Sequence, residues 1–209
     1  MTFLKRIPYI LLAVGGVGVG LYPILYFILD QNFGLLQTKS DAILADLLWN
    51  GMFYTHIILG GLALLIGWIQ FNKKIQRNHI QLHRNVGKIY MISVLFSGIS
   101  GIYIGYYATG GLITKIGFIA LGITWLYTTF RGYTSVRKRN IITHQKMMIY
   151  SYAACFAAVT LRIWLPILSI SLGDFLPAYK IVAWLCWVPN IIVAYFIIHQ
   201  KSKYAYIKQ

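Results

Sequence analysis

The sequence contains no glutamate, and its only acidic residues are Asp30, Asp41, Asp46 and Asp174. None of the four lies inside a long apolar run, so the sequence lacks the carboxylates that usually carry protons or bind sodium within membranes. This absence argues against a carboxylate-coupled ion transporter. It also argues against a hydrolase or lipid-modifying enzyme, because no acid is placed to orient a histidine base beside a nucleophile.

Cysteine is scarce as well. Cys155 and Cys186 occur in no CxxC motif and in no Cys/His pattern typical of zinc sites, which argues against metal-thiolate chemistry. Their expected depths in two neighbouring apolar runs differ by roughly 10 Å at the rise of an α-helix, more than a disulfide spans. We therefore expect two free thiols.

Long apolar runs dominate what is present: 58% of the residues are hydrophobic and only 11% are charged. A helix needs about 20 apolar residues to cross the hydrocarbon of a bilayer. Six runs approach that length, at residues 8–29, 50–71, 86–108, 112–133, 146–168 and 180–198. The sequence predicts an all-α membrane bundle of six transmembrane helices in a single domain, residues 1–209. Helices two to five, about 50–168, form its core, and helices 8–29 and 180–198 flank them.

Charge is distributed unevenly between the connections. The four aspartates follow alternate runs, whereas the main basic clusters lie in the other connections and at both ends: Lys5, Arg6, Lys73, Lys74, Arg77, Arg84, Lys88, Arg131, Arg137, Lys138, Arg139, Lys146, Lys201, Lys203 and Lys208. By the positive-inside rule both termini are cytoplasmic. The formal charge of +15 would suggest nucleic acid in a soluble chain. Here we expect no nucleic acid, because these side chains flank spans, where anionic lipid headgroups attract them.

Small residues recur where helices are expected to pack. Gly16 and Gly20 lie one turn apart in the first run, Gly60 and Gly61 are adjacent in the second, and Gly98 belongs to a small-residue stripe of the third. Small side chains let helix backbones approach closely in lipid. We interpret these glycines as packing faces.

The two long basic loops each precede a histidine. Asn78 lies five residues before His83, and Asn140 lies four residues before His144. Each asparagine is predicted to cap the helix that returns into the membrane. The two imidazoles are then expected at the same level, near the cytoplasmic face.

Imidazoles from different helices at equal depth are how transmembrane b-type cytochromes hold haem iron. The first hypothesis is therefore haem b bound by His83 and His144, with Arg84 and Lys146 against the propionates. Another metal is an alternative, using His79 one turn before His83. The simplest interpretation is that these histidines only contact headgroups or carbonyls at a wet interface, since a pair of histidines is not a specific signal.

A second polar level is expected near the opposite face. His56 lies about 15 residues before the cytoplasmic end of the second helix, and Arg162 lies about 18 residues after His144, so both are over 20 Å from the inner face at 1.5 Å per residue. A buried arginine usually faces the bundle interior or a cavity. The pair is a candidate site for a quinone carbonyl or an anionic headgroup. Alternatively, Arg162 caps carbonyls near Pro166 and His56 satisfies a neighbouring helix.

The residues from His56 to about Pro166 resemble a bacterial family of predicted membrane proteins catalogued as a domain of unknown function. The motifs that carry the resemblance are His56-x3-Gly60, Gly67-x2-Gln70-Phe71, His83-Arg84-x2-Gly87-x-Ile89-Tyr90, His144-x2-Met147-Met148 and Ala158-Val159-Thr160-Leu161-Arg162. The resemblance implies a multi-pass protein of the bacterial cytoplasmic (inner) membrane and draws attention to His56, His83, Arg84, His144 and Arg162. It implies no reaction.

Two functions therefore stay open. One is a membrane oxidoreductase or electron-transfer subunit with haem b near the cytoplasmic face and an outer pocket for a quinone or other small molecule. The rival is a cofactor-free subunit for small-molecule or lipid binding, transport or assembly with membrane protein partners. The rival predicts a pocket between the second and fifth helices that opens toward the outside.

Overall fold

The computed structural model describes residues 7–29 and 34–206, and within these ranges the regular structure is helical, with no strand. Six helical segments are long and apolar enough to cross a membrane: Tyr9–Ile28, Leu47–Phe71, Ile80–Tyr106, Leu112–Arg137, Ile141–Leu172 and Phe175–Gln200. The expected all-α bundle with six spans is therefore confirmed.

Several spans consist of more than one helix. The first contains α1 (Ile7–Gly20), η2 (Tyr22–Ile24) and α2 (Leu25–Ile28), and the second contains α4 (Leu47–Gly67) and η4 (Trp68–Phe71). The third and fourth are the single helices α6 (Ile80–Tyr106) and α7 (Leu112–Arg137). The fifth is divided into α8 (Ile141–Cys155) and α9 (Ala157–Leu172), and the sixth into α10 (Phe175–Leu185) and α11 (Val188–Tyr206). Short helices η3 (Gly34–Thr38), α3 (Asp41–Leu44) and α5 (Lys73–Asn78) lie in the connections.

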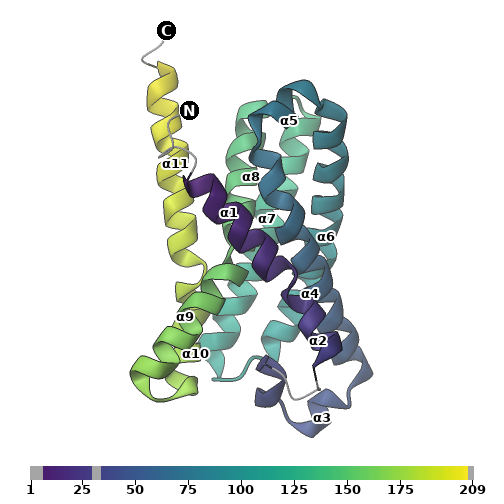
Figure 1. Cartoon of the computed structure of the whole chain (residues 1–209), viewed down its shortest axis with the longest axis vertical. Coiled ribbons are helices and arrows are strands. Elements are labelled where there is room, and N and C mark those ends of the chain that lie inside the picture. Colours follow the sequence, from purple (N-terminus) through teal and green to yellow (C-terminus); the bar gives the residue numbers. More distant parts are fainter. Residues whose placement is uncertain (1–6, 30–33, 207–209) are drawn as a thin grey trace.

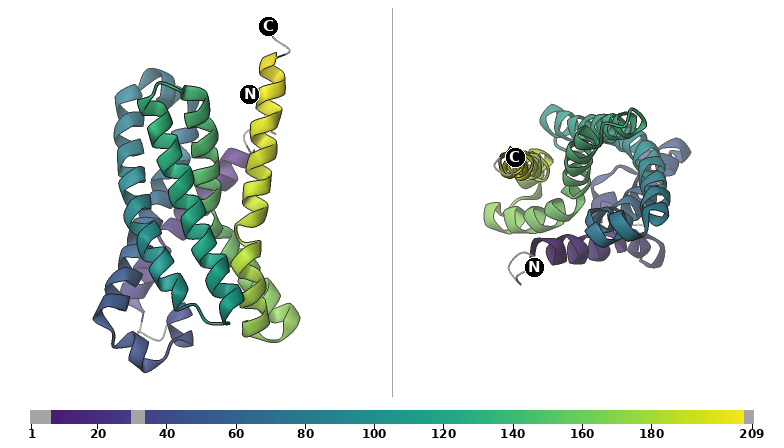
Figure 2. Two further views of the ribbon diagram at one scale, coloured as in Figure 1. Left: turned by 180° about the vertical axis from the view of Figure 1, so that it is seen from behind. Right: turned by 90° about the horizontal axis from the view of Figure 1, so that it is seen from above.

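Neighbouring spans pack in sequence order, α4 against α6, α6 against α7 and α7 against α8. Figure 1 shows α1 crossing the outside of α4 obliquely, and Figure 2, viewed from above, places α11 at the edge of the molecule. Helix α10 packs against α9 and α7, and α11 packs against α8. The first and last spans thus flank the four central ones.

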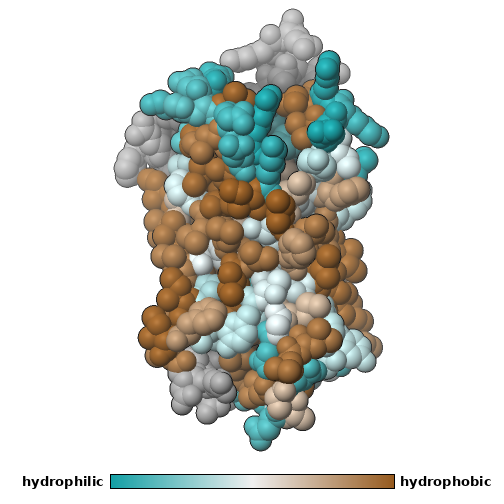
Figure 3. Space-filling view, turned by 90° about the vertical axis from the view of Figure 1, so that its right-hand side faces the viewer, coloured by the Kyte–Doolittle hydropathy of each residue, from teal (hydrophilic) through white to brown (hydrophobic). Residues whose placement is uncertain are grey.

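The two ends of the bundle differ in charge. The α5 end carries the basic connections, while Asp41, Asp46 and Asp174 belong to the opposite, α3 end (Figure 1). Figure 3 shows a hydrophobic band with hydrophilic residues gathered above it at the α5 end. Lys5, Arg6, Asp30 and Lys208 lie outside the described residues, and only the backbone of Lys201 and Lys203 is described. The cytoplasmic orientation of the α5 end and the bacterial inner membrane both stay predictions.

The third and fifth spans begin earlier than hydropathy predicts, at Ile80 and Ile141 in place of residues 86 and 146. Lysine, arginine and glutamine have high helix propensity, so the helix continues past the apolar run into the headgroup region. Asn140 caps α8 as predicted, because its side-chain oxygen accepts a hydrogen bond from the Thr143 amide at 3.0 Å.

The predicted cap at Asn78 is wrong. An additional helix, α5, occupies the connection and ends at Asn78, so His79 takes the cap position of α6 and forms no capping bond with its side chain. Asn72 caps α5 instead, accepting a hydrogen bond from the Lys74 amide at 2.9 Å. Asn72 and Asn78 both have a side chain that can cap a helix. Because α5 occupies the connection, Asn72 becomes its N-cap and Asn78 becomes its last residue.

Glycines bring α1 and α4 into backbone contact, as the sequence predicts. A Cβ added to Gly20 would lie 3.0 Å from the Gly61 carbonyl oxygen, and one added to Gly61 would lie 2.7 Å from the Gly20 oxygen. Gly16 meets the Leu64 carbonyl in the same way, at 3.1 Å. This contact holds the first span against the second.

The fifth and sixth spans are interrupted side by side. Pro189 lacks the amide hydrogen that would bond the Leu185 carbonyl, which explains why α10 ends there. The Asn190 side-chain amide lies 3.0 Å from the Cys186 carbonyl and 3.3 Å from that of Ala153, and it also reaches the hydroxyl of Thr160 at 3.1 Å. These bonds satisfy polar groups within the span and join the two interruptions.

A buried hydrogen-bonded network fills the bundle between α6, α7 and α8. The Tyr90 hydroxyl lies 2.8 Å from that of Ser151 and accepts a hydrogen bond from Trp125 Nε1 at 3.3 Å, and Ser151 lies 2.6 Å from the Thr129 hydroxyl. All four side chains are at most 6% exposed. The network forms a packed layer between the two polar levels expected from the sequence.

Candidate functional site

A chamber of about 650 Å³ lies inside the bundle. Its walls come from α1, η2, α2, α4, α6, α7, α8, α9 and α10, and residues of η3 line it at the α3 end. Pockets of 300 to 1,000 Å³ typically hold small organic molecules. The chamber therefore has the size of a ligand site, and both the second and the fifth spans line it.

His56 and Arg162 both line this chamber. His56 follows the first residue of α4 by nine positions, and Arg162 precedes the last residue of α9 by ten. At 1.5 Å per residue each lies about 15 Å from the α3 end of its helix. The structure therefore places the two predicted residues in the wall of one chamber, at one depth.

The His56 ring is fixed by α6. Its Nδ1 lies 2.8 Å from the Ser97 carbonyl oxygen, and the Ser97 hydroxyl donates a hydrogen bond to the His56 carbonyl at 2.9 Å. A carbonyl only accepts, so Nδ1 carries the hydrogen and neutral His56 is left with a lone pair on Nε2. A Cβ on Gly101 would lie 2.7 Å from Nδ1, so this glycine makes room for the ring. No described residue forms a hydrogen bond with Nε2.

Arg162 has neutral neighbours. One terminal nitrogen donates a hydrogen bond to the Ala158 carbonyl at 2.9 Å, and the guanidinium carbon lies 4.2 Å from the centre of the Tyr22 ring. Its Nε is shielded from solvent and forms no hydrogen bond. Among the residues that the structure describes, no carboxylate forms an ion pair with Arg162. The guanidinium is therefore a buried charge with unused donor capacity.

A second cation lies nearer the α3 end. Lys39 lines the chamber, and its ammonium group donates hydrogen bonds to the Tyr107 carbonyl at 2.5 Å and the Thr109 hydroxyl at 3.3 Å. Burial and the nearby Lys115 lower the pKa of Lys39 below its ordinary value. Lys39 was not predicted from the sequence as a candidate site residue.

The described aspartates do not offset these cations. Asp46 accepts hydrogen bonds from the first amides of α4, and Asp174 accepts one from the Leu176 amide of α10. Neither they nor Asp41 are among the lining residues. Within the described ranges, the chamber is thus lined by two cations and a histidine without an acid.

The part of the chamber farther from the α3 end is apolar. Leu64, Leu121, Trp125 and Cys155 line it, together with Gly98 of α6. Cys155 and Cys186 are both buried free thiols, as expected. The charged side chains of the chamber thus lie at the level of Arg162 and toward the α3 end, and none lines the far part.

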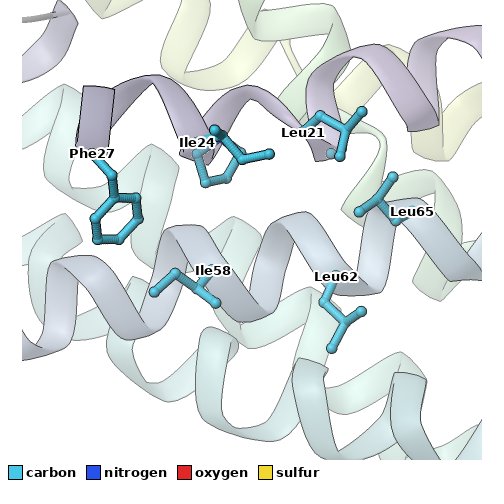
Figure 4. A pocket seen from close by; sticks show the side chains of 8 residues that line it. Leu21, Ile24, Phe27, Ile58, Leu62 and Leu65 are labelled. Carbon is cyan, nitrogen blue, oxygen red and sulfur yellow. The ribbon is translucent and has the colours of Figure 1, made fainter. Parts of the chain in front are cut away.

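A shallower groove of about 290 Å³ lies between the first and second spans. Figure 4 shows residues that line it, Leu21, Ile24 and Phe27 from the first span and Ile58, Leu62 and Leu65 from α4. Gly20 and Pro23 complete this lining, and Pro23 also lines the chamber. The groove offers no polar side chain for chemistry.

The predicted haem ligands lie at the α5 end. His83 and His144 each follow the first residue of their helix, α6 and α8, by three positions, and they are close enough to interact electrostatically. His144 Nδ1 lies 2.9 Å from the Gly132 carbonyl oxygen, whereas His83 Nδ1 is shielded and has no partner. The equal depth expected from the sequence is confirmed.

The supporting residues predicted for this level are more peripheral. Arg84 and His79 are exposed, and Lys146 is half-buried. Within the described ranges, no three His, Cys, Asp or Glu side chains form a group that could hold a metal ion. A structural zinc site usually has four ligands, so His79, His83 and His144 do not make a complete set by themselves.

The chamber also has an aromatic part, which was not predicted from the sequence. Tyr22 and Tyr26, one helical turn apart, line it together with Trp49 and Phe53, which stack with ring centres 5.2 Å apart. The spacing of each pair, four residues, was visible in the sequence. The position of Pro23 between the tyrosines was a further signal of a bend in the first span.

Comparison with known proteins gives one match. A family model described as "Predicted membrane protein (DUF2306)" matches residues 53–198, more than half of the chain. No curated protein matches the chain, and no solved structure does.

Proposed function

The chain belongs to this DUF2306 family of predicted membrane proteins, and we propose that it binds a small lipid-soluble molecule in its interior chamber. The observation that carries the proposal is a chamber of about 650 Å³ that His56 and Arg162 both line, at one depth. A mostly apolar pocket with a few convergent polar groups is the usual form of a small-molecule site. The proposal corresponds to the cofactor-free alternative of the sequence analysis.

The chamber is shaped for a guest that comes from the bilayer. The first span covers it, and the apolar groove beside Pro23 lies between that span and α4, next to the chamber. The exposed side chains there, including Leu21, Ile24 and Phe27, are 46%, 50% and 63% exposed and are compatible with lipid tails. A molecule dissolved in the membrane therefore has an apolar surface to approach.

The experiment measures saturable binding of dodecanol by native mass spectrometry of the purified protein in mild detergent. The wild type is expected to bind one molecule. Ala158→Phe places a ring in the chamber wall and is expected to weaken binding by about tenfold or more, equivalent to about 1.4 kcal/mol. The control is Ile163→Phe, on the same helix at a side chain that is 52% exposed to lipid.

Two results contradict the proposal. One is the absence of any saturable dodecanol adduct on folded wild-type protein. The other is equal binding by the wild type and Ala158→Phe, because this would put the bound molecule outside the chamber.

A second candidate function, haem b binding at the α5 end, is favoured by the proximity of His83 and His144. An axial histidine commonly donates its other ring nitrogen to a carbonyl, and His144 has such a partner in Gly132. Haem would supply electron transfer there, with Arg84 and Lys146 as the nearest candidates for the propionates. A quinone in the chamber would be its natural electron partner.

The test is a reduced-minus-oxidised absorption spectrum of protein produced with added haem precursor. If the two imidazoles hold haem, the wild type shows a Soret band, and His144→Ala loses it while keeping its helical circular dichroism. Colourless wild-type protein removes this candidate and leaves the chamber proposal unaffected.

A further inference from the structure

We infer that the guest of the chamber carries an acidic headgroup, a carboxylate or a phosphate, which Arg162 binds. The inference rests on the proposed function, because it names the class of molecule that the chamber takes. Four features of the described residues support it: the charge balance, the free donors of Arg162, the hydrogen-bonding state of His56 and the division of the lining into polar and apolar parts.

The charge balance favours an anion. Arg162 and Lys39 both line the chamber, and no described carboxylate does. An unpaired charge removed from water is costly, so buried charges are normally paired. The described aspartates of the α3 end are engaged as helix caps or lie off the chamber, so the missing partner is expected to come with the guest.

The guanidinium of Arg162 has N–H donors that form no hydrogen bond within the described residues. The hydrogen bond to Ala158 uses one terminal nitrogen, and the shielded Nε forms none. Guanidinium groups bind carboxylates and phosphates through two parallel N–H donors, which makes such pairs stronger and more directional than neutral hydrogen bonds. The Tyr22 ring, 4.2 Å from the guanidinium carbon, holds the group in place for this contact.

His56 complements an acid better than it complements a ketone. With Nδ1–H engaged by the Ser97 carbonyl, the neutral ring presents an acceptor at Nε2. A quinone carbonyl needs a donor at this position. A hydrogen phosphate monoester carries one proton that can bridge its oxygen and Nε2, and a carboxylate can bind there once His56 has taken up a proton from water, while in both cases Arg162 binds the other oxygen.

The rest of the lining suits a single apolar tail. Beyond His56 the chamber is bounded by Leu64, Leu121 and Trp125, and Trp125 belongs to the packed layer described above. A chain that starts at Arg162 thus points toward the middle of the bundle and is enclosed there. The Lys39 ammonium stands on the other side, toward the α3 end, where it attracts an arriving anion.

The experiment compares guests that differ only in their headgroup. Dodecanoate, dodecyl phosphate and dodecanol are titrated separately against the purified full-length protein, with occupancy read by native mass spectrometry. Charge-assisted hydrogen bonds favour the acid, so the wild type is expected to bind at least one of the two anions about ten- to a hundredfold more tightly than dodecanol. The two anions distinguish a carboxylate from a phosphate site.

Arg162→Gln is expected to abolish this preference, and Arg162→Lys is expected to retain part of it. Dodecanol binding also reports that the variant chamber is intact. A purely structural arginine predicts no change in headgroup preference on either substitution.

The outcomes separate the two proposals. If dodecanol, dodecanoate and dodecyl phosphate all fail to bind the wild type, the proposed function fails. If all bind equally, or if the preference for an anion survives in a folded Arg162→Gln variant, the chamber proposal stands and the acidic headgroup is overturned. If Arg162→Gln does not fold, the acidic headgroup is tested by two other results. The wild type must bind an anion more tightly than dodecanol, and Arg162→Lys must show a smaller preference than the wild type.

Discussion

Replacing Gly67 by alanine is expected to destabilise the protein by about 1 to 3 kcal/mol, the usual range for overpacking a close-packed interior. The added Cβ would lie 2.5 Å from Tyr152 Cε2 and 2.9 Å from Tyr90 Cε2. These rings are 3% and 1% exposed, and each hydroxyl is hydrogen-bonded, Tyr152 to the Leu64 carbonyl and Tyr90 to Ser151. Neither ring can move aside without breaking such a bond.

The measurement is thermal unfolding in mild detergent, followed by circular dichroism. The matched control is Gly51→Ala on the same helix, where an added Cβ meets nothing within 4 Å. That control is expected to be neutral or slightly stabilising, since alanine is the better helix former. Equal melting temperatures for the two variants would contradict the close packing around Gly67.

Gly20→Leu is expected to separate the first span from the second and to open the chamber wall. A Cβ at Gly20 already lies 2.6 Å from Leu65 Cγ and 3.0 Å from the Gly61 carbonyl oxygen, and backbone cannot yield as a side chain can. We expect a loss of about 1 to 3 kcal/mol in stability. Because η2 begins two residues after Gly20 and lines the chamber, we also expect dodecanol binding to weaken by about tenfold.

Gly18→Leu is the control for this prediction. It lies two residues earlier on α1, and a Cβ there meets nothing within 4 Å. Thermal unfolding and dodecanol occupancy are measured on both variants and the wild type. If Gly20→Leu matches Gly18→Leu in both measurements, the contact between α1 and α4 does not shape the chamber.

The depth of the candidate residues could be predicted from the sequence, since helix rise converts residue number into height. This is why His56 and Arg162 were expected at one level and His83 and His144 at another. Rotation about each helix axis could not be predicted in this way. The apolar runs are hydrophobic all round, so their pattern does not show which face meets a neighbour.

The chamber itself depends on features that hydropathy does not record. The fifth span changes direction near Phe156, where no proline occurs, and the sequence alone gave no reason to divide it there. Lys39 was overlooked because a lysine in a connection is ordinarily solvated. It is half-buried here because its ammonium group bonds to the Tyr107 carbonyl, a contact between residues 68 positions apart.

The junction at Asn190 sets the geometry of the chamber. Arg162 and Tyr179 lie beyond the two interruptions, on α9 and α10, which pack against each other, whereas His56 stands on the uninterrupted α4. The separation of the guanidinium and the imidazole across the chamber is therefore fixed by the angle between the halves of the fifth span, and Asn190 holds that angle from the neighbouring span.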